Sequence, residues 1–377
     1  MKNNIVVNIL GDIYITEDNK QIINSDRFKK LFNGIFETLN NATINIANLE
    51  GPLANISDKP ILKTGPNLKN PIKLLDSLVN SNIGVLTLGN NHILDYGDNA
   101  LFNTINEIEK RGLKYVGAGK NLEEAKKPLI IEVEGIKIGV INFAEHEFNT
   151  ANVYSPGANG FDCLYSFDEI SRLKSKCKYL IVVYHGGIEY HKYPSPWLRS
   201  ICRKMVESGA DVVITQQSHC IGTKEEYLNG EILYGQGNTV FGYKRNNNDW
   251  NHGLIVQLVI DSDSLKVNYV PIEAIEGGGI DLMKDNLKEQ VMRGFKKRSD
   301  KIYQKEFIEK EWVRFCNSKK SIYLGHLFGF NRYLIFLNRK LNNKIIDIYF
   351  SRRKKMIVHN LVRCESHHEV LETILKN

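Results

Sequence analysis

Short apolar, β-branched runs alternate with amphipathic segments over residues 4–275, and this alternation predicts the elements of most of the chain. The segments 99–110 and 196–208 carry apolar residues at helical spacing, as helices connecting parallel strands do. Glu134-Gly135 and Asn229-Gly230 are typical of hairpin turns, so antiparallel strands are expected as well. The pattern indicates a layered α/β core. The expected strands are 4–10, 43–48, 83–88, 114–116, 129–133, 136–143, 178–184, 211–215, 231–234 and 254–260.

The pattern changes at the glycine run that follows Glu276. Such a run is typical of a boundary between parts of a chain. Beyond it the sequence is rich in Lys, Arg and aromatic residues, with helical periodicity through 283–317 and 331–377. We therefore expect an α/β domain over 1–276 and a basic, mainly helical accessory segment over 280–377.

The composition, with 42% hydrophobic and 25% charged residues, is that of an ordinary globular protein. No run approaches the roughly 18–20 apolar residues that a membrane helix needs, so no transmembrane helix is expected. The first apolar run breaks at Gly11-Asp12, which fits a first strand better than a signal peptide. The six cysteines show no CxxC spacing and are expected to be reduced. These features favour a cytoplasmic location.

Charge is distributed unevenly along the chain. Residues 281–377 contain 22 Lys and Arg against 11 Asp and Glu, whereas residues 1–280 contain 28 against 32. A basic segment attached to a mildly acidic body favours contact with an anionic partner, namely membrane headgroups, nucleic acid or an acidic polymer. The simpler interpretation is a solvated helical face.

Polar clusters follow several of the predicted strands. Side chains at the carboxyl ends of parallel strands enter the crevice in which α/β proteins bind ligands. The most informative cluster comes directly after 83–88 and combines amides, an imidazole and a carboxylate within a few positions. The five clusters contain Asp12 and Tyr14; Asn48 and Glu50; Asn90, Asn91, His92 and Asp95; His185, Glu189 and Tyr190; and Gln217 and His219, followed by Asn238.

Carboxylates, neutral imidazoles and an amide oxygen together suit a divalent ion such as Zn²⁺, Mn²⁺, Fe²⁺ or Mg²⁺. Each cluster alone has a simpler explanation, since Asp12 could cap a helix and a lone His185 or His219 could be a core residue. Their recurrence at successive strand ends favours one shared site. His146, between Glu145 and Glu147, has no partner cluster and is expected to be a loop residue.

Taken in order, these stretches resemble the bacterial capsule-synthesis proteins of the CapA/PgsA type, which are associated with poly-γ-glutamate and belong to the calcineurin-like metallophosphoesterase superfamily. The resemblance covers roughly residues 5–275 and implies an α-β-β-α sandwich with a site for one or two divalent ions. The matching stretches are 11–13, 48–53, 90–97, 117–119, 185–190, 208–213 and 234–238.

The resemblance also implies a role for each residue of the clusters. His92 would protonate the leaving oxygen, while Asp95 and Glu189 match positions typical of the capsule family and are grouped with His92 as catalytic. Glu50 resembles a carboxylate that bridges two metals. The implied metal ligands are Asp12, Glu50, Asn91, His185, Gln217 and His219, and the implied substrate-binding residues are Asn48, Asn90, Tyr190 and Asn238.

Four positions depart from the pattern of the resemblance, and two of them, Gln236 and Thr239, lie in the motif around Asn238. Gln217 stands where relatives carry a ligand imidazole, and Tyr14 stands where true phosphoesterases carry a histidine. A glutamine carbonyl is a weaker ligand for soft metals than an imidazole, so the site is expected to hold one ion, two weak ones, or an oxygen-preferring ion.

We therefore expect a metal-dependent hydrolase or transferase of the capsule-synthesis type, most simply one that hydrolyses a phosphorylated substrate in the synthesis of an anionic surface polymer. The alternative is a non-catalytic scaffold that binds the anionic polymer or capsule-synthase partners. The resemblance implies an N-terminal hydrophobic membrane anchor in many relatives, whereas no such anchor is expected here. The protein is accordingly expected to be cytosolic or docked peripherally on the inner membrane face through its basic segment.

Overall fold

The computed structural model describes residues 4–24, 28–55 and 57–376 of the 377-residue chain. The chain divides into two compact units, Met1–Glu309 and Lys310–Asn377, called the main unit and the C-terminal unit below. Among the described residues, no helix combines the length and the apolarity that a membrane crossing requires.

The first sheet of the main unit is built around four parallel strands. Its order is β16-β15-β14-β1-β2-β3-β4, with β13 also pairing with β1. β14 is antiparallel to β1 and to β15, so the sheet is mixed. The strands are β1 (Ile5–Ile13), β2 (Ile44–Leu49), β3 (Val85–Thr87), β4 (Lys114–Val116), β13 (Asn238–Val240), β14 (His252–Ile260), β15 (Leu265–Ala274) and β16 (Ile280–Leu282).

The second sheet has the order β11-β12-β10-β9-β7-β6. β7, β9, β10 and β12 run parallel, and an antiparallel strand closes each edge. The strands are β6 (Leu129–Val133), β7 (Ile136–Ala144), β9 (Tyr179–His185), β10 (Val212–Gln216), β11 (Ile221–Tyr227) and β12 (Gly230–Gln236); β5 (Ala118–Gly119) and β8 (Gly157–Ala158) form a separate ribbon.

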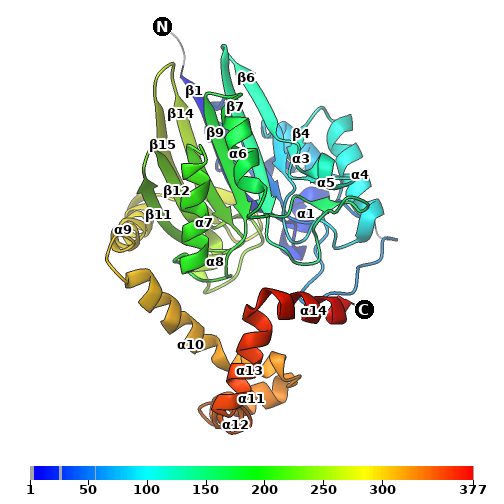
Figure 1. Cartoon of the computed structure of the whole chain (residues 1–377). Coiled ribbons are helices and arrows are strands. Elements are labelled where there is room, and N and C mark those ends of the chain that lie inside the picture. The colour runs from blue at the N-terminus through cyan, green and yellow to red at the C-terminus, as the bar shows by residue number, and fades with distance from the viewer. Residues whose placement is uncertain (1–3, 25–27, 56, 377) are drawn as a thin grey trace. The chain divides into compact units, whose positions relative to one another are not determined.

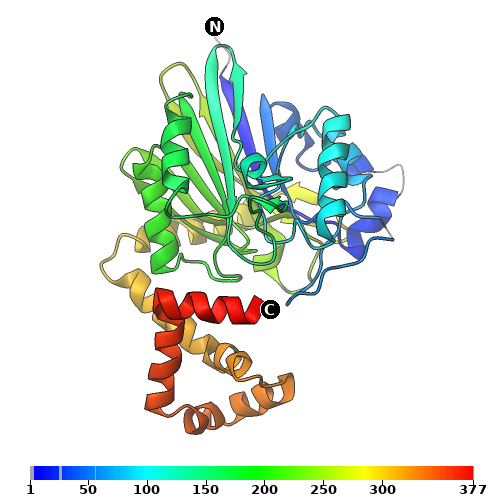
Figure 2. The ribbon, with the colours of Figure 1, turned by 45° about the vertical axis from the view of Figure 1, so that its right-hand side comes forward.

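The two sheets pack face to face between two layers of helices, and the helix layers lie on opposite sides of the strands (Figures 1 and 2). Residues such as Val7 and Ile46 from the first sheet meet Val140 and Ile181 from the second in one buried apolar cluster. A second cluster joins the first sheet to α3 (Leu74–Asn80) and α4 (Gly97–Lys110), and a third joins the second sheet to α6 (Ser166–Lys174) and α7 (Pro196–Glu207). The predicted α-β-β-α sandwich is confirmed.

The helices of the main unit vary from single turns to five turns. They are α1 (Glu17–Asn24), α2 (Phe36–Asn40), α3 (Leu74–Asn80), α4 (Gly97–Lys110), α5 (Leu122–Ala125), α6 (Ser166–Lys174), α7 (Pro196–Glu207), α8 (Asn248–Asn251) and α9 (Asp285–Lys301), with a 3₁₀ turn at Phe28–Leu31.

Both predicted hairpins are present. Glu134 and Gly135 have φ values of 50° and 78° and join β6 to β7, which is the backbone that a two-residue turn requires. In the second hairpin, Gly230 already begins β12, and the positive φ falls on Leu228. The turn therefore lies one residue earlier than predicted.

The division between the units lies later than the boundary predicted at 276–280. Directly after the glycine run, β16 pairs with β15, and α9 then packs against β11. Ser299 of α9 accepts a hydrogen bond from the backbone nitrogen of Lys224 (2.9 Å), and Phe295 packs edge-on against Tyr269. These contacts tie residues 280–309 to the main unit.

The C-terminal unit is helical, as its periodicity predicts. α10 (Phe307–Leu327) begins in the last residues of the main unit and continues into the C-terminal unit. Four further helices follow, namely α11 (Arg332–Lys340), α12 (Lys344–Tyr349), α13 (Arg352–Arg363) and α14 (Glu365–Lys376).

Candidate metal centre

Five strands of the two sheets deliver polar side chains to one place. Asp12 lies at the end of β1, Asn48 and Glu50 at the end of β2, and His185 is the last residue of β9. The loops after β3 and β10 contribute the remaining clusters. Because these strands run parallel within their sheets, their carboxyl ends meet at the same edge of the sandwich.

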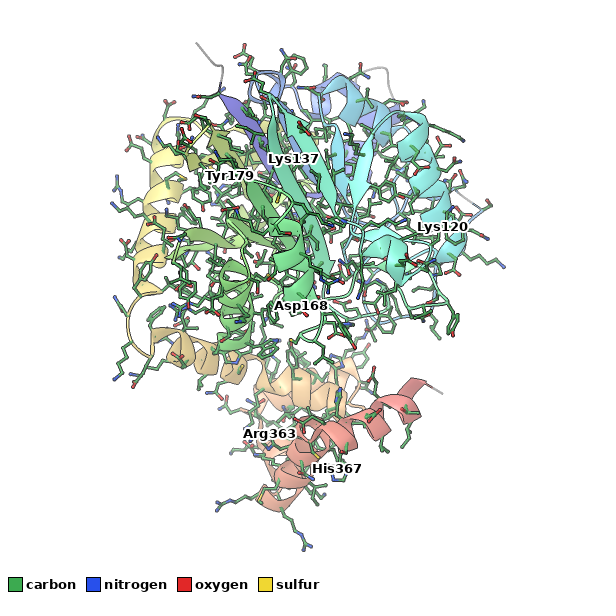
Figure 3. The ribbon with its side chains drawn as sticks, turned by 45° about the horizontal axis from the view of Figure 1, so that its top comes forward. Lys120, Lys137, Asp168, Tyr179, Arg363 and His367 are labelled. Carbon is green, nitrogen blue, oxygen red and sulfur yellow. The ribbon has the colours of Figure 1, made fainter. Side chains whose placement is uncertain are left out.

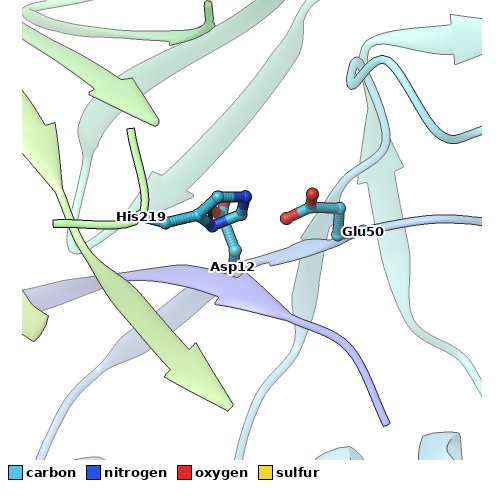
Figure 4. A group of neighbouring side chains, drawn as sticks. All are labelled: Asp12, Glu50 and His219. Atoms are coloured by element: carbon cyan, nitrogen blue, oxygen red, sulfur yellow. Dashed lines mark ion pairs between the residues drawn. The ribbon is translucent and has the colours of Figure 1, made fainter. Parts of the chain in front are cut away.

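Asp12, Glu50 and His219 form a compact group that could hold a metal ion. One ligand atom from each lies within 4.8 Å of the others, and all three residues are buried. Figure 4 shows the Glu50 carboxylate directed toward the His219 imidazole, with Asp12 beside them. Two carboxylates and an imidazole are common ligands of Zn²⁺ and other first-row divalent ions.

The Asp12 carboxylate is held by hydrogen bonds to both of its oxygens. Asn48 Nδ2 donates to Oδ1 (2.9 Å), and the backbone nitrogen of Gln217 donates to Oδ2 (3.4 Å). Burial raises the pKa of Asp12 to about 7, although these hydrogen bonds act in the opposite direction. A cation in the group would favour the charged form.

The environment of the Glu50 carboxylate favours a bound cation. Its Oε2 atom is buried and has no hydrogen-bond partner among the described residues. Burial, then the nearby Asp12 carboxylate and then Glu189 raise the pKa of Glu50 well above its ordinary value. A buried, unpaired carboxylate oxygen beside another carboxylate is costly, and a bound divalent ion would remove that cost.

Two imidazoles from the second sheet flank Asp12 of the first sheet: His185 ends β9, and His219 lies in the loop between β10 and β11. His185 Nδ1 lies 3.8 Å from Asp12 Oδ1, and His219 Nδ1 lies 3.7 Å from Asp12 Oδ2. Burial, together with the nearby His92, lowers the pKa of His219 to about 4, and burial together with His92 and His219 lowers the pKa of His185 well below its ordinary value. Both rings are therefore neutral near pH 7, which is the form that binds metals.

His185 is also linked to the amides of two other clusters. Its Nε2 lies 3.2 Å from Asn91 Oδ1, and its Nδ1 lies 3.4 Å from Asn48 Nδ2. Asn48 therefore contacts both Asp12 and His185. The structure thus brings Asn91 and His185 together beside the compact group, as the sequence predicts for neighbouring ligands.

His92 faces the group from the loop after β3. Its Nδ1 lies 2.6 Å from Asp95 Oδ2, and its Nε2 lies 3.8 Å from Glu50 Oε1. Asp95 also accepts a hydrogen bond from the backbone nitrogen of Leu68 (2.6 Å) and forms an ion pair with Lys63. Lys63 Nζ lies 3.1 Å from His92 Nδ1. His92, Asp95 and Lys63 form one connected unit.

The Asn90 amide joins the loop after β2 to the loop after β3 through hydrogen bonds. Its Nδ2 donates to Asn48 Oδ1 (3.2 Å) and to the Leu49 carbonyl (2.8 Å), while its Oδ1 accepts from the backbone nitrogens of Gly51 and His92. These bonds engage both ends of the amide. Asn90 therefore fixes the loop after β2 to the loop after β3.

His219 sits against an aromatic wall. Its ring lies 4.9 Å from both the Phe241 and the Trp250 rings, and its Nδ1 lies 2.8 Å from Asn238 Oδ1. Asn238 Nδ2 in turn donates to the Trp250 carbonyl (3.0 Å). The ring of Tyr190 lies 6.2 Å from those of His219 and Trp250. Asn238 therefore orients His219, and Tyr190 lies at the exposed side of the wall.

The loop after β10 has a tight backbone. Gln217 and His219 have positive φ values of 77° and 51°. Gln217 Nε2 donates to Glu147 Oε1 (3.3 Å), whereas its Oε1 is buried without a hydrogen-bond partner among the described residues. Glu189 is exposed at the rim and close enough to raise the pKa of Glu50.

Two residues of the neighbourhood are absent from the sequence-based set. Glu147 Oε1 accepts from both Asn91 Nδ2 (3.3 Å) and Gln217 Nε2 (3.3 Å), so it bridges two clusters. Its place shortly after β7 is the signal that could have found it, because β7 is parallel to β9. Lys63 lies in a polar loop, where the sequence alone gives no signal of its contact with His92 and Asp95.

Comparison with known proteins identifies the family. The family described as bacterial capsule synthesis protein PGA_cap matches residues 6–243, a segment that contains every predicted site residue. This chain belongs to that family. Its membership confirms the resemblance seen in the sequence.

Individual relatives carry related names. The chain is 26% identical over 283 residues to the capsule biosynthesis protein CapA of Bacillus anthracis, covering 72% of this chain and 68% of that protein. It is 29% identical over 229 residues to the PGA biosynthesis protein CapA of Bacillus subtilis (strain 168), covering 59% of each chain. A probable polyglutamine synthesis accessory protein of Mycobacterium tuberculosis is 25% identical over 173 residues, covering 42% of this chain and 46% of that one.

Two solved structures from Thermus thermophilus are similar at low sequence identity. A hypothetical protein aligns with a TM-score of 0.45 at 12% identity, covering 71% of this chain and 98% of that chain. A 5'-nucleotidase precursor aligns with a TM-score of 0.40 at 12% identity, covering 78% of this chain and 59% of that chain.

Proposed function

We propose that this protein is a metal-dependent hydrolase that acts on a phosphorylated substrate in the synthesis of an anionic surface polymer of the poly-γ-glutamate type. The observation that carries the proposal is Glu50 Oε2, which is buried beside the Asp12 carboxylate with no hydrogen-bond partner among the described residues and therefore fits a bound divalent ion. The family membership supports the link to capsule synthesis. The neutral His185 and His219 supply the remaining ligand chemistry.

The proposed ligands fall into two neighbouring sets. Asp12, Glu50 and His219 would hold one ion, and Asn91 and His185, which contact each other, could contribute to a second, with Glu50 as the shared carboxylate. Gln217 lies beside both sets, because its backbone nitrogen contacts Asp12 and its side chain shares Glu147 with Asn91. When bound, Mn²⁺, Zn²⁺, Fe²⁺ or Mg²⁺ would supply Lewis acidity and an activated water. Asn48 fixes Asp12 and His185 in place through its amide.

His92 is the proposed general acid. Asp95 contacts Nδ1 of His92, so Nε2 of His92 points toward the Glu50 carboxylate. From this position, His92 Nε2 can donate a proton to a leaving oxygen. Tyr190, with 47% of its surface exposed beside Trp250, is the proposed substrate contact, and Glu189 lies next to it at the rim. Because the amides of Asn90 and Asn238 are engaged by neighbours, we assign these two residues a positioning role.

The test begins with metal content. The protein is purified without chelator, its bound metals are measured by mass spectrometry, and hydrolysis of bis(4-nitrophenyl) phosphate is followed with added Mn²⁺. Glu50→Gln should lose both metal and hydrolysis, whereas the exposed Glu132→Gln should change neither. Wild-type protein that binds no divalent ion and hydrolyses no phosphoester would overturn the proposal.

One observation favours a non-catalytic scaffold as the second candidate. The position at which an imidazole is expected is occupied by Gln217, whose amide is a weaker ligand for soft metals. A scaffold would bind an anionic polymer or capsule-synthase partners without hydrolysis. Polymer binding that Glu50→Gln leaves intact, in a protein with no hydrolytic rate, would favour this candidate.

We further propose that the basic C-terminal segment makes a peripheral contact with a membrane face. The support is its surplus of positive charge, since Lys and Arg near an anionic leaflet are attracted to its surface.

A further inference from the structure

Lys and Arg outnumber Asp and Glu more strongly within the C-terminal unit than over residues 281–377 as a whole. Residues 312–364 contain 12 Lys and Arg and a single acidic residue, Asp347. That carboxylate is already paired, since its Oδ1 lies 2.6 Å from Lys320 Nζ and 3.4 Å from Lys355 Nζ. The stretch therefore presents positive charge with almost no internal compensation, which is complementary to an anionic surface.

α11 exposes apolar side chains on the side that faces away from the buried residues of the C-terminal unit. Ile335 and Asn338 are 8% and 0% exposed and face inward. Tyr333, Phe336 and Leu337 are 70%, 61% and 48% exposed and stand at i, i+3 and i+4 on the outer side. A surface helix ordinarily places polar residues there, whereas α11 exposes this apolar stripe together with its basic residues Arg332, Arg339 and Lys340.

α13 combines an exposed apolar stripe with a basic first turn. It buries none of its residues, and Ile357, Leu361 and Val362 are 54%, 37% and 54% exposed. Its first turn is Arg352-Arg353-Lys354-Lys355. Positive charge at a helix N-terminus opposes the helix dipole, so this placement lowers helix stability in water. An anionic partner would offset that cost.

We propose that the C-terminal unit docks on an anionic lipid surface, with the apolar stripes of α11 and α13 inserted at the headgroup boundary and the basic side chains on the headgroups. This inference deepens the peripheral contact proposed above by naming the surface. The apolar stripes decide between a bilayer and a soluble polyanion. Exposed Tyr, Phe, Leu and Ile gain by burial in a bilayer interface, whereas an acidic polymer offers them no apolar phase.

The experiment is vesicle flotation of the full chain. Vesicles of phosphatidylcholine alone are compared with vesicles that also contain phosphatidylglycerol, at low and high salt. The full chain should float with the anionic vesicles and not with the neutral ones. Salt should weaken binding, because it screens the basic residues.

Two variants separate charge from apolar insertion. Changing Arg352, Arg353, Lys354 and Lys355 to Gln should reduce vesicle affinity by at least tenfold, since each charge near the surface contributes about fivefold. Changing Ile357, Leu361 and Val362 to Gln should also reduce affinity at least tenfold while the charges remain. Gln suits a helix, and α13 buries no residue, so the fold is expected to persist; circular dichroism checks it.

Matched controls come from the main unit. Lys120, Lys137, Lys176 and Lys266 are exposed, and changing all four to Gln removes the same charge without affecting the proposed surface. Figure 3 labels Lys120 and Lys137 on the main unit and Arg363 on α13. Changing Val153, Leu164 and Leu228 to Gln, at positions 67%, 75% and 72% exposed, matches the three-residue apolar change. Both control proteins should bind vesicles as the wild type does.

Each outcome is decisive. No flotation of the full chain overturns both the docking surface and the peripheral contact. Flotation that the α13 apolar variant retains overturns the docking surface alone and assigns the contact to charge. Binding to poly-glutamate in place of vesicles assigns the basic residues to a soluble polymer and also overturns the inference. Phosphodiester hydrolysis, measured on the same proteins, tests the hydrolase proposal independently of vesicle binding.

Discussion

His92 Nδ1 lies 2.6 Å from Asp95 Oδ2, three residues further along the same loop. The contact orients the imidazole so that Nε2 is 3.8 Å from Glu50 Oε1. His92 and Glu50 follow the neighbouring parallel strands β3 and β2, so the sheet sets the distance between them. A proton donor is thereby held beside the buried carboxylate pair.

His92→Ala should retain most of the bound metal and lose most of the hydrolytic rate. Removal of a positioned general acid typically lowers the rate by about 10²–10⁴-fold, and His92 is outside the compact Asp12, Glu50 and His219 group. Metal content and phosphodiester hydrolysis are measured on the same preparation. Glu50→Gln and Asn91→Ala are the comparison variants and should lose metal as well. Equal metal loss in all three proteins would make His92 a ligand or a structural residue.

Asp12→Asn should stabilise the metal-free protein at pH 8. The folded pKa of Asp12 is about 7, above the ordinary value of 3.8, so the folded state binds its proton more strongly and loses stability as pH rises from about 4 to 7. The amide cannot ionise and avoids that loss, which is at most roughly 4 kcal/mol.

Urea unfolding of both proteins across this pH range measures the difference. The buried neutral histidines act with the opposite sign, but they are present in both proteins and largely cancel. The stability gain should shrink toward zero near pH 4, and added Mn²⁺ should reverse it at pH 8. A pH-independent gain would show that the charge on Asp12 is not its source.

The strand ends explain why much of the site could be predicted from the sequence. Asp12, Glu50 and His185 each follow an apolar run, and parallel strands bring such positions together whatever their separation in the chain. Glu147 follows β7 by the same rule, but the sequence shows no partner cluster for the segment around His146 and so predicts an ordinary loop there.

Other strands and residue roles depend on contacts with residues distant in the sequence, which a local pattern does not predict. β11 was missed because Lys224-Glu225-Glu226 reads as a polar segment, yet Glu225 is buried and bound by Arg199 and Arg203 of α7. β15 was missed because it is half-exposed and contains Pro271. Asn90 was predicted to bind substrate, but its role emerges only when the loops after β2 and β3 are seen joined.

Gln217→His should strengthen metal binding. Gln217 Oε1 is buried without a partner among the described residues, and the Gln217 backbone contacts Asp12 Oδ2, so an imidazole here would face the compact group. The φ of 77° is tolerated by His better than by branched residues. Isothermal titration with Zn²⁺ and Mn²⁺ measures the affinities. The gain should be larger for Zn²⁺, because imidazole is the softer ligand. Gln216→His, one residue earlier, is the control and should show no gain.

Lys63→Met should destabilise the fold through Asp95. The Lys63 and Asp95 side chains are only 2% and 1% exposed and form an ion pair. Removal of one partner of a buried pair typically costs about 3–5 kcal/mol, because the remaining charge has no counterion. Asp95 would keep its contacts with His92 and the Leu68 nitrogen, which places the expected loss at the lower end of that range. Urea unfolding measures it.

The double variant Lys63→Met with Asp95→Asn should recover part of the lost stability, since no uncompensated charge then remains. Lys20→Met is the matched control, because the Lys20–Glu17 pair is 52% and 85% exposed and such pairs contribute about 0–1 kcal/mol. The same double variant should lose hydrolytic rate, because an amide at position 95 would hold His92 Nδ1 less strongly than the carboxylate does. If Lys63→Met unfolds no more easily than Lys20→Met, the buried pair does not support the loop, and the orientation of His92 must be attributed to Asp95 alone.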